Sequence, residues 1–242
     1  MLATRDRAVI LAAGLGTRLA DGRPLPKPLR EVAGVPLIVR IIGALQRAGV
    51  REIGIVIGHL GDELRRGLME YQYEAKLSLF PNDEYEKPNG TSLLKARDFV
   101  TGPTLLLMSD HLWEPRLLST VASFPIGERE SVLGVDFRIE ACFDLDDATK
   151  VQVQGDRITG IGKTLGSYNA LDTGVFMITP AFIEALDAVN GAAGCSLSQG
   201  VAALAATGRM RAADVGDATW IDVDTPEAHA EAERLLATHA LG

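Results

Sequence analysis

The hydrophobic positions in the first half of the chain alternate between two periodicities. Ala8–Ala13 is a continuous apolar run that ends at glycines, which is typical of a strand buried on both faces. Val35–Ala48 repeats its apolar residues at helical spacing, and Gly49 follows as a helix stop. The same alternation continues and predicts strands at Glu52–Ile57, Ala75–Phe80 and Thr104–Met108, with helices at Gly61–Tyr71 and Thr91–Phe99.

This alternation predicts an α/β fold with a Rossmann-like, mostly parallel mixed sheet and helices on both faces. Ligands of such sheets bind beyond the carboxyl ends of the strands. Gly14 and Asp110 each follow a predicted buried strand, so both are expected at that edge.

The second half of the chain has fewer helices between its strands, which indicates a mixed region covering the ligand site. No repeat or linker interrupts the pattern, so residues 1–242 are expected to form a single domain. The elements predicted here are strands at Ser131–Asp136, Lys150–Val153, Arg157–Lys163, Thr173–Ile178 and Trp220–Val223, and helices at Pro180–Val189, Leu197–Ala206 and Pro226–Ala240.

Composition narrows the class of protein. The chain is 47% hydrophobic and carries a net charge of -8, so it lacks the basic balance of a general nucleic-acid binder. Its two cysteines, Cys142 and Cys195, are far apart and form no zinc motif. No apolar run resembles a signal peptide or a membrane span. We therefore expect a cytoplasmic protein without direct membrane insertion.

The loop after the first strand carries the strongest chemical signal. Gly14 and Gly16 let the backbone approach phosphates, and Arg18 offers a planar fork for phosphate oxygens. Lys27 lies between two prolines, which predicts a stiff loop that presents a point charge. A dinucleotide fingerprint requires a third glycine where Leu19 stands, and a Walker A loop is absent. The remaining alternative is an ordinary strand–helix turn beside a solvated lysine.

The segments LAAGLGTRL, PKPL and VAGVPLIVRIIGAL resemble the opening of the sugar-phosphate and alcohol-phosphate nucleotidyltransferases, and the resemblance covers nearly the whole chain. It implies the nucleotide-diphospho-sugar transferase fold, with Arg18 and Lys27 as catalytic residues. It also implies that the base is held by the segment after Pro88, although Thr91 could equally cap a helix. The nucleotide-binding residues implied are Leu11, Ala12, Ala13, Gly14, Gly16, Thr17, Asn89, Gly90, Thr91 and Ser92.

The same resemblance implies Mg²⁺ as the cofactor, with Asp110, Asp222 and Asp224 as its ligands. Carboxylate oxygens suit this hard cation, and Asp222 and Asp224 would face the same way on a strand. Asp224 could instead help to cap the closing helix. His111 either contacts the acceptor or fills the pocket wall.

The segments DATKV, IGK and YNALDTG are similar to the inositol-1-phosphate cytidylyltransferase branch. That similarity implies that Lys163 meets the acceptor phosphate and that Asp172 accepts hydrogen bonds from polyol hydroxyls. The neighbouring acidic run Asp144–Asp147 fails the EF-hand pattern and is interpreted as a solvated loop.

The expected reaction is attack by inositol 1-phosphate on the α-phosphorus of CTP, giving CDP-inositol and pyrophosphate. The acceptor is already largely ionised at neutral pH, so it needs no general base. Rival interpretations are transfer to phosphocholine, a phosphonate or a hexose 1-phosphate, a non-catalytic nucleotide-binding domain, and a dinucleotide oxidoreductase. Some members of the branch are fused to a membrane synthase that uses the product, and here a separate synthase is expected.

Overall fold

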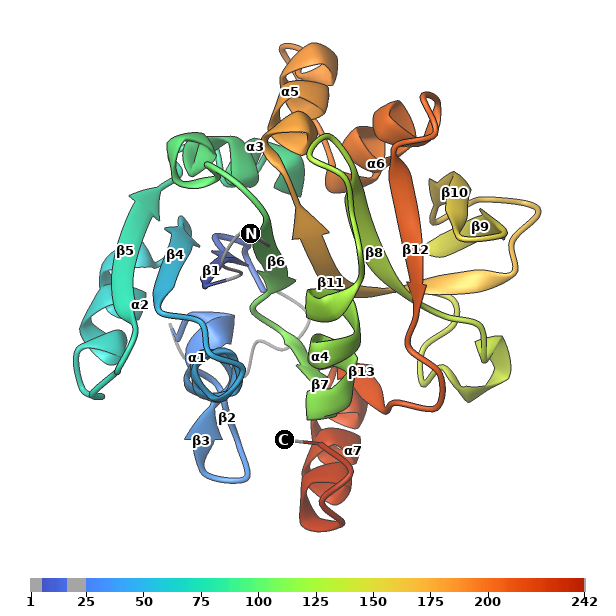
Figure 1. Ribbon diagram of the computed structural model, residues 1–242. Coiled ribbons are helices and arrows are strands. Elements are labelled where there is room, and N and C mark those ends of the chain that lie inside the picture. The colour runs from blue at the N-terminus through green and yellow to red at the C-terminus, as the bar shows by residue number, and fades with distance from the viewer. Residues whose placement is uncertain (1–5, 17–24, 242) are drawn as a thin grey trace.

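The computed structural model describes residues 6–16 and 25–241, and its largest element is a nine-stranded sheet with the order β5-β4-β1-β6-β11-β8-β12-β10-β9. Figure 1 shows β5 at one edge and β9 and β10 at the other. The strands are β1 (Arg7–Ala12), β4 (Glu52–Ile57), β5 (Lys76–Pro81), β6 (Thr104–Met108), β8 (Ser131–Asp136), β9 (Lys150–Gln154), β10 (Arg157–Gly162), β11 (Ala170–Ile178) and β12 (Met210–Asp214).

Three of the four parallel strand pairs in the described sheet come from the first half of the chain, and the fourth joins β8 to β12. β1 pairs in parallel with β4 and β6, and β4 pairs in parallel with β5. β11 then runs antiparallel to both β6 and β8, and β10 runs antiparallel to β9 and β12. The expected α/β fold with a mixed sheet is therefore confirmed, with the parallel pairs concentrated where the strand–helix alternation is regular.

Helices cover both faces of the sheet because the strands are apolar on both sides. Ala8, Ile10 and Ala12 of β1 belong to the core cluster that includes α1 (Leu37–Arg47), α2 (Gly61–Leu68) and α4 (Pro115–Ser123). Val9 and Leu11 belong to the cluster on the other face, with α3 (Asn89–Lys95), α5 (Pro180–Val189) and α6 (Leu197–Ala205). This two-face alternation has the period of two expected of a strand.

The observed elements differ from the predicted ones at several places, including the following. The strand β12 was missed, since Arg211 and two alanines weaken its β pattern. The helix α4 was also missed. The helix expected at Thr91–Phe99 begins at Asn89 and ends at Lys95, and a separate 3-10 turn follows at Arg97–Phe99.

A small second sheet lies beyond the carboxyl end of β6. It pairs β7 (His111–Trp113) with β13 (Trp220–Asp222) in antiparallel register. α7 (Pro226–Ala237) packs beside it, and Leu112, Ile221 and Ala228 share a small core there. This arrangement joins residues from the middle of the chain to residues near its carboxyl end, as Figure 1 shows for β7, β13 and α7.

The helices of residues 6–16 and 25–241 are too short or too polar for any of them to cross a membrane.

Candidate active site

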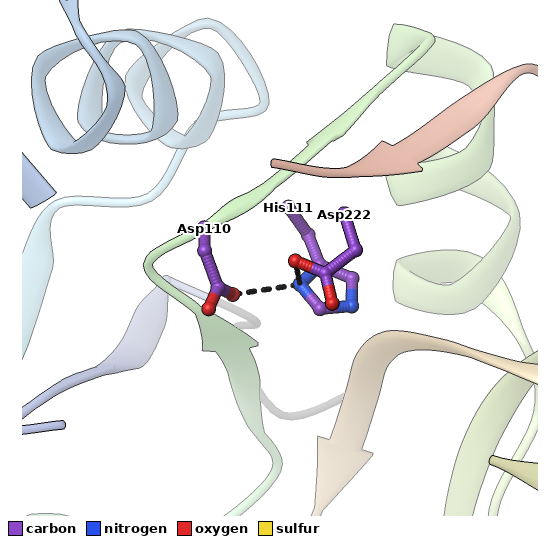
Figure 2. A group of neighbouring side chains, drawn as sticks. All are labelled: Asp110, His111 and Asp222. Carbon is purple, nitrogen blue, oxygen red and sulfur yellow. Dashed lines mark hydrogen bonds and ion pairs between the residues drawn. The ribbon is translucent and has the colours of Figure 1, made fainter. Parts of the chain in front are cut away.

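The small sheet brings three acidic or imidazole side chains together. Asp110 lies two residues after the end of β6, and the register of β7 with β13 places Asp222 opposite His111. The backbone amide of Val223 also donates to the Asp110 carbonyl, at 2.9 Å. Figure 2 shows that the side chains of Asp110, His111 and Asp222 point toward one another. The predicted strand-end site is therefore assembled from two distant segments.

Lys27 lies at the centre of the acidic cluster. Its side chain is only 7% exposed, and its Nζ is 2.7 Å from an oxygen of Asp110 and 4.0 Å from one of Asp222. It also forms an ion pair with Asp224. A buried ammonium needs such partners, because an unpaired charge is costly away from water. The cluster thus binds the lysine of one loop to carboxylates from two other segments.

The backbone around Lys27 differs from the expected loop. Lys27 begins a 3-10 turn over Lys27–Leu29. Gly16 makes room for this lysine, because a Cβ at Gly16 would lie 2.5 Å from the Lys27 Cβ, and its φ is +60°. Gly16 is therefore needed both for its left-handed backbone and for the packing of Lys27.

His111 is held by the surrounding carboxylates. Its Nδ1 is 2.8 Å from an oxygen of Asp110 and 3.9 Å from one of Asp222 (Figure 2). Burial disfavours the charged ring, but Asp222 and the hydrogen bond to Asp110 outweigh it and raise the pKa of His111 to about 9. Burial likewise opposes the charge of Asp110, yet Lys27 and His111 hold the pKa of that carboxyl well below its ordinary value.

Gly174 closes the wall behind His111. Its φ is +73°, and a Cβ there would lie 2.6 Å from the imidazole ring. The Asp172 carboxylate accepts a hydrogen bond of 2.8 Å from the Gly174 amide, which fixes this bend of β11. The glycine therefore lets the ring lie against the strand.

We expect Gly174→Ala to displace His111 and strain the backbone, because an alanine meets both the ring and an unfavourable φ. A loss of about 1–3 kcal/mol in unfolding free energy is expected from the backbone strain alone. Denaturant unfolding of both proteins measures it. Gly102→Ala is the matched control, because nothing lies within 4 Å of its added Cβ. Equal stability of the two variants would contradict the packing role of Gly174.

The alternative that Asp224 caps the closing helix is not what the structure shows. The hydroxyl of Thr225 accepts the hydrogen bond from the Ala228 amide at 3.2 Å and so caps α7. The side chain of Asp224 pairs with Lys27 instead. Thr225 therefore caps the helix, and the carboxylate of its neighbour Asp224 belongs to the acidic cluster.

Two groups of side chains in this cluster could hold a cation. One comprises Asp110, His111 and Asp222, and the other comprises Asp147, Asp222 and Asp224, with the ligand atoms of each group within 4.8 Å of one another. Carboxylate oxygens are the donors that hard divalent cations prefer, so the donor set fits such an ion. Asp147 is a correction to the sequence interpretation, since the solvated acidic loop supplies one member of this cluster.

Two adjoining cavities meet at the cluster. The first, of about 370 Å³, lies over the glycine loop and is bordered by Lys27 and Asp110. The second, of about 340 Å³, extends toward β11 and is bordered by Asp172 and Lys163. His111 and Asp224 line both cavities. Two ligands placed one in each cavity would therefore meet beside the acidic cluster.

Some of the predicted nucleotide-binding residues line the first cavity, and others pack elsewhere or lie outside the described residues. Ala12 packs into the core with α1, which is the opposite face from the cavity. Gly90 faces the Cys195 carbonyl, 2.7 Å from where its Cβ would lie, and the Thr91 hydroxyl accepts a hydrogen bond from the Cys195 amide. Thr17 and Arg18 lie outside the described residues. Those that line the first cavity are Leu11, Ala13, Gly14, Gly16, Asn89 and Ser92.

The predicted acceptor residues both border the second cavity. Asp172 lies inside it, and burial raises the pKa of its carboxyl to about 6. Lys163 follows β10, is 58% exposed and forms an ion pair with Asp147. Both predicted acceptor residues therefore line the same cavity.

Sequence reasoning missed several cavity residues. Tyr85, Lys87 and Ser109 line the first cavity. Asp136 and Arg138 line the second cavity. Asp136 ends a buried strand as Asp110 nearly does, so the same strand-end signal could have identified it.

Comparisons with known proteins agree on one class. The model of the MobA-like NTP transferase domain matches residues 8–133. A protein of Rubrobacter xylanophilus named bifunctional IPC transferase and DIPP synthase is 35% identical over 228 residues, covering 91% of this chain and 49% of that protein. The chain thus spans about half the length of this relative. A 2-aminoethylphosphonate cytidylyltransferase of Lancefieldella rimae is 36% identical over 158 residues, 62% of this chain and 60% of that protein.

Among solved structures, the inositol-1-phosphate CTP transferase from T. maritima superposes with a TM-score of 0.86 at 26% identity. The match covers 97% of this chain and 96% of that one. It confirms the expected nucleotide-diphospho-sugar transferase fold.

Proposed function

This chain belongs to the family of MobA-like NTP transferase domains and is a nucleotidyltransferase, and from that premise we propose that it converts CTP and inositol 1-phosphate into CDP-inositol and pyrophosphate. The observation that carries the proposal is the cluster of Lys27 with Asp110, Asp222 and Asp224 at the junction of two cavities. CTP would occupy the cavity over the glycine loop, and the acceptor would occupy the cavity beside β11.

The reaction requires two anions to meet, so positioning and charge compensation supply the catalysis. An oxygen of the acceptor phosphate forms a bond to the α-phosphorus while the bond to the β-phosphate oxygen breaks and pyrophosphate leaves. The acceptor phosphate is largely ionised at pH 7 because its second pKa is about 6. Lys27 would compensate charge on the pentavalent centre, and Arg18 would do so at the leaving pyrophosphate.

A divalent cation, Mg²⁺ in our proposal, would be held by Asp110 with Asp222 or Asp224. Bound there, it would supply Lewis-acid neutralisation of phosphate oxygens. Lys27, which lies beside the same carboxylates, would add a second positive charge facing the phosphates. The base would be held between Asn89 and Ser92, which line the cavity over the glycine loop.

Lys163 would hold the acceptor phosphate, and Asp172 would accept hydrogen bonds from its hydroxyls. The Rubrobacter relative pairs, in its name, an IPC transferase with a DIPP synthase. We propose that a membrane synthase likewise consumes the CDP-inositol made here. A cytoplasmic location is also proposed, and the unpaired thiols of Cys142 and Cys195 support it.

We expect pyrophosphate release only when CTP, inositol 1-phosphate and Mg²⁺ are all present. A coupled pyrophosphate assay across four nucleoside triphosphates and an acceptor panel of inositol 1-phosphate, glucose 1-phosphate, phosphocholine and 2-aminoethylphosphonate tests this. Chelation by EDTA should abolish the signal and added Mg²⁺ should restore it. Preference for another acceptor would overturn the assignment of inositol 1-phosphate, and activity in EDTA would overturn the role of the cation.

A further inference from the structure

Arg138 projects from the end of β8 into the acceptor cavity in a fixed orientation. Its Nη2 donates to a carboxylate oxygen of Asp136 at 2.8 Å and to the Ala218 carbonyl at 2.7 Å, and its Nε donates to Asp136 at 3.1 Å. The side chain remains 38% exposed and lines the cavity. Its third nitrogen, Nη1, makes no hydrogen bond within residues 6–16 and 25–241. The guanidinium is therefore held by hydrogen bonds from Nε and Nη2, and its Nη1 edge remains able to donate to a ligand.

Asp136 is the anchor of this arrangement. Its side chain is 4% exposed, and it accepts hydrogen bonds from the Arg138 backbone amide at 2.8 Å and from the Trp220 indole at 2.9 Å, besides those of the guanidinium. A buried carboxylate that accepts this many hydrogen bonds is held in one orientation. It neutralises Arg138 without using all of its N–H groups.

Trp220 separates Arg138 from the acidic cluster. Its ring lies parallel to that of His111, with 6.4 Å between the centroids and 5° between the planes. His111 contacts Asp110, where the α-phosphate would react, so a chain of contacts runs from Asp110 through His111 and Trp220 to Asp136, the carboxylate that holds Arg138. The phosphate of an acceptor must lie at the Asp110 end to attack. Arg138 therefore faces the remainder of the acceptor molecule.

We propose that Arg138 selects the acceptor, by donating hydrogen bonds from its open edge to the hydroxyl groups of a polyol phosphate and by disfavouring acceptors whose far end is an ammonium group. This inference rests on the proposed function. A guanidinium only donates hydrogen bonds, and a hydroxyl can accept them whereas an ammonium cannot. Asp172, on the neighbouring strand β11, lines the same cavity and supplies a hydrogen-bond acceptor, so the cavity offers both the donor and the acceptor that a ring of hydroxyls requires.

The test compares Arg138→Lys and Arg138→Gln with the unchanged chain. Lysine keeps a charge beside Asp136 but loses the planar fork, and glutamine loses the charge as well. We expect kcat/KM for inositol 1-phosphate to fall at least about tenfold in both variants, as for loss of a charge-assisted hydrogen bond. The fall should come from KM of the acceptor, with KM for CTP unchanged. Competitive inhibition by 2-aminoethylphosphonate should strengthen in Arg138→Gln.

Arg129→Lys is the matched control, because Arg129 is 61% exposed and, among the residues that the structure describes, forms its ion pair with Glu184 at the surface. Thermal unfolding establishes that each variant is folded. If the loss of the charge that pairs with Asp136 unfolds Arg138→Gln, the comparison uses Arg138→Lys alone. An unchanged acceptor KM in a folded Arg138→Lys protein would overturn the inference while the proposed function stands. No transfer by the unchanged chain to inositol 1-phosphate, with transfer to 2-aminoethylphosphonate, would overturn both.

Discussion

Replacement of Lys27 by methionine is expected to lower kcat about a hundredfold to a thousandfold, the size of effect found when one preorganised charge-stabilising group is removed. The side chain is buried among Asp110, Asp222 and Asp224, so its charge acts in a site with little water to screen it. Methionine has a similar length and preserves the contact with Gly16. Steady-state pyrophosphate release at saturating CTP and acceptor measures the loss.

Lys95→Met provides the matched control for this variant, since Lys95 also pairs with a carboxylate, that of Glu84, but outside both cavities. The control is expected to keep the turnover of the unchanged chain. Removal of Lys27 also leaves three carboxylates facing one another, so each protein is compared with Mg²⁺ present and its unfolding is recorded. A folded Lys27→Met protein with unchanged turnover would exclude Lys27 from the reaction.

The second large effect is expected for Asp110→Asn, which should reduce turnover by roughly the same two to three orders of magnitude. The amide has the shape of the carboxylate but lacks the charge that pairs with Lys27 and His111. It would also be a poorer ligand for a divalent cation. The Mg²⁺ concentration that gives half-maximal activity is therefore expected to rise.

The same measurements on Asp222→Asn and Asp224→Asn show which of these two carboxylates contributes more to cation binding, a question that the sequence left open. Asp217→Asn is the control, because Asp217 is 79% exposed and pairs with Arg116 away from the cluster. An Asp110→Asn protein with full turnover and an unaltered Mg²⁺ requirement would show that Asp110 neither binds the cation nor orders Lys27.

The order of the strands and helices in the first half was predictable because each buried strand there is a short apolar run closed by glycine or aspartate. Glu52–Ile57 was predicted to the residue. β12 could not be predicted in this way, because Arg211 and Asp214 are polar and its alanines have little β preference. Its place between β8 and β10 depends on pairing with strands that are distant in the sequence, which a local sequence pattern does not indicate.

The position of a candidate site residue was predictable where an acidic residue follows a buried strand, as for Asp110. The partnership of Asp136 with Arg138 and Trp220 was not predicted, since it depends on a hydrogen bond between residues 84 positions apart. Gly90 and Thr91 show the converse: the motif that marks them lies close to the cavity, but their own contacts are with Cys195. Local sequence indicates the region of a site more readily than the direction of each side chain.

The pairing of β7 with β13 has a consequence for how the protein acquires its activity during synthesis. The chain up to Met108 contains the strands that border the cavity over the glycine loop, but Asp222 reaches His111 only after a further hundred or so residues have been made. Contacts of such long sequence separation form late and slowly. A growing chain therefore assembles the proposed active site only when its distal segment docks, so a nascent polypeptide on the ribosome is expected to bind and hydrolyse no nucleotide there.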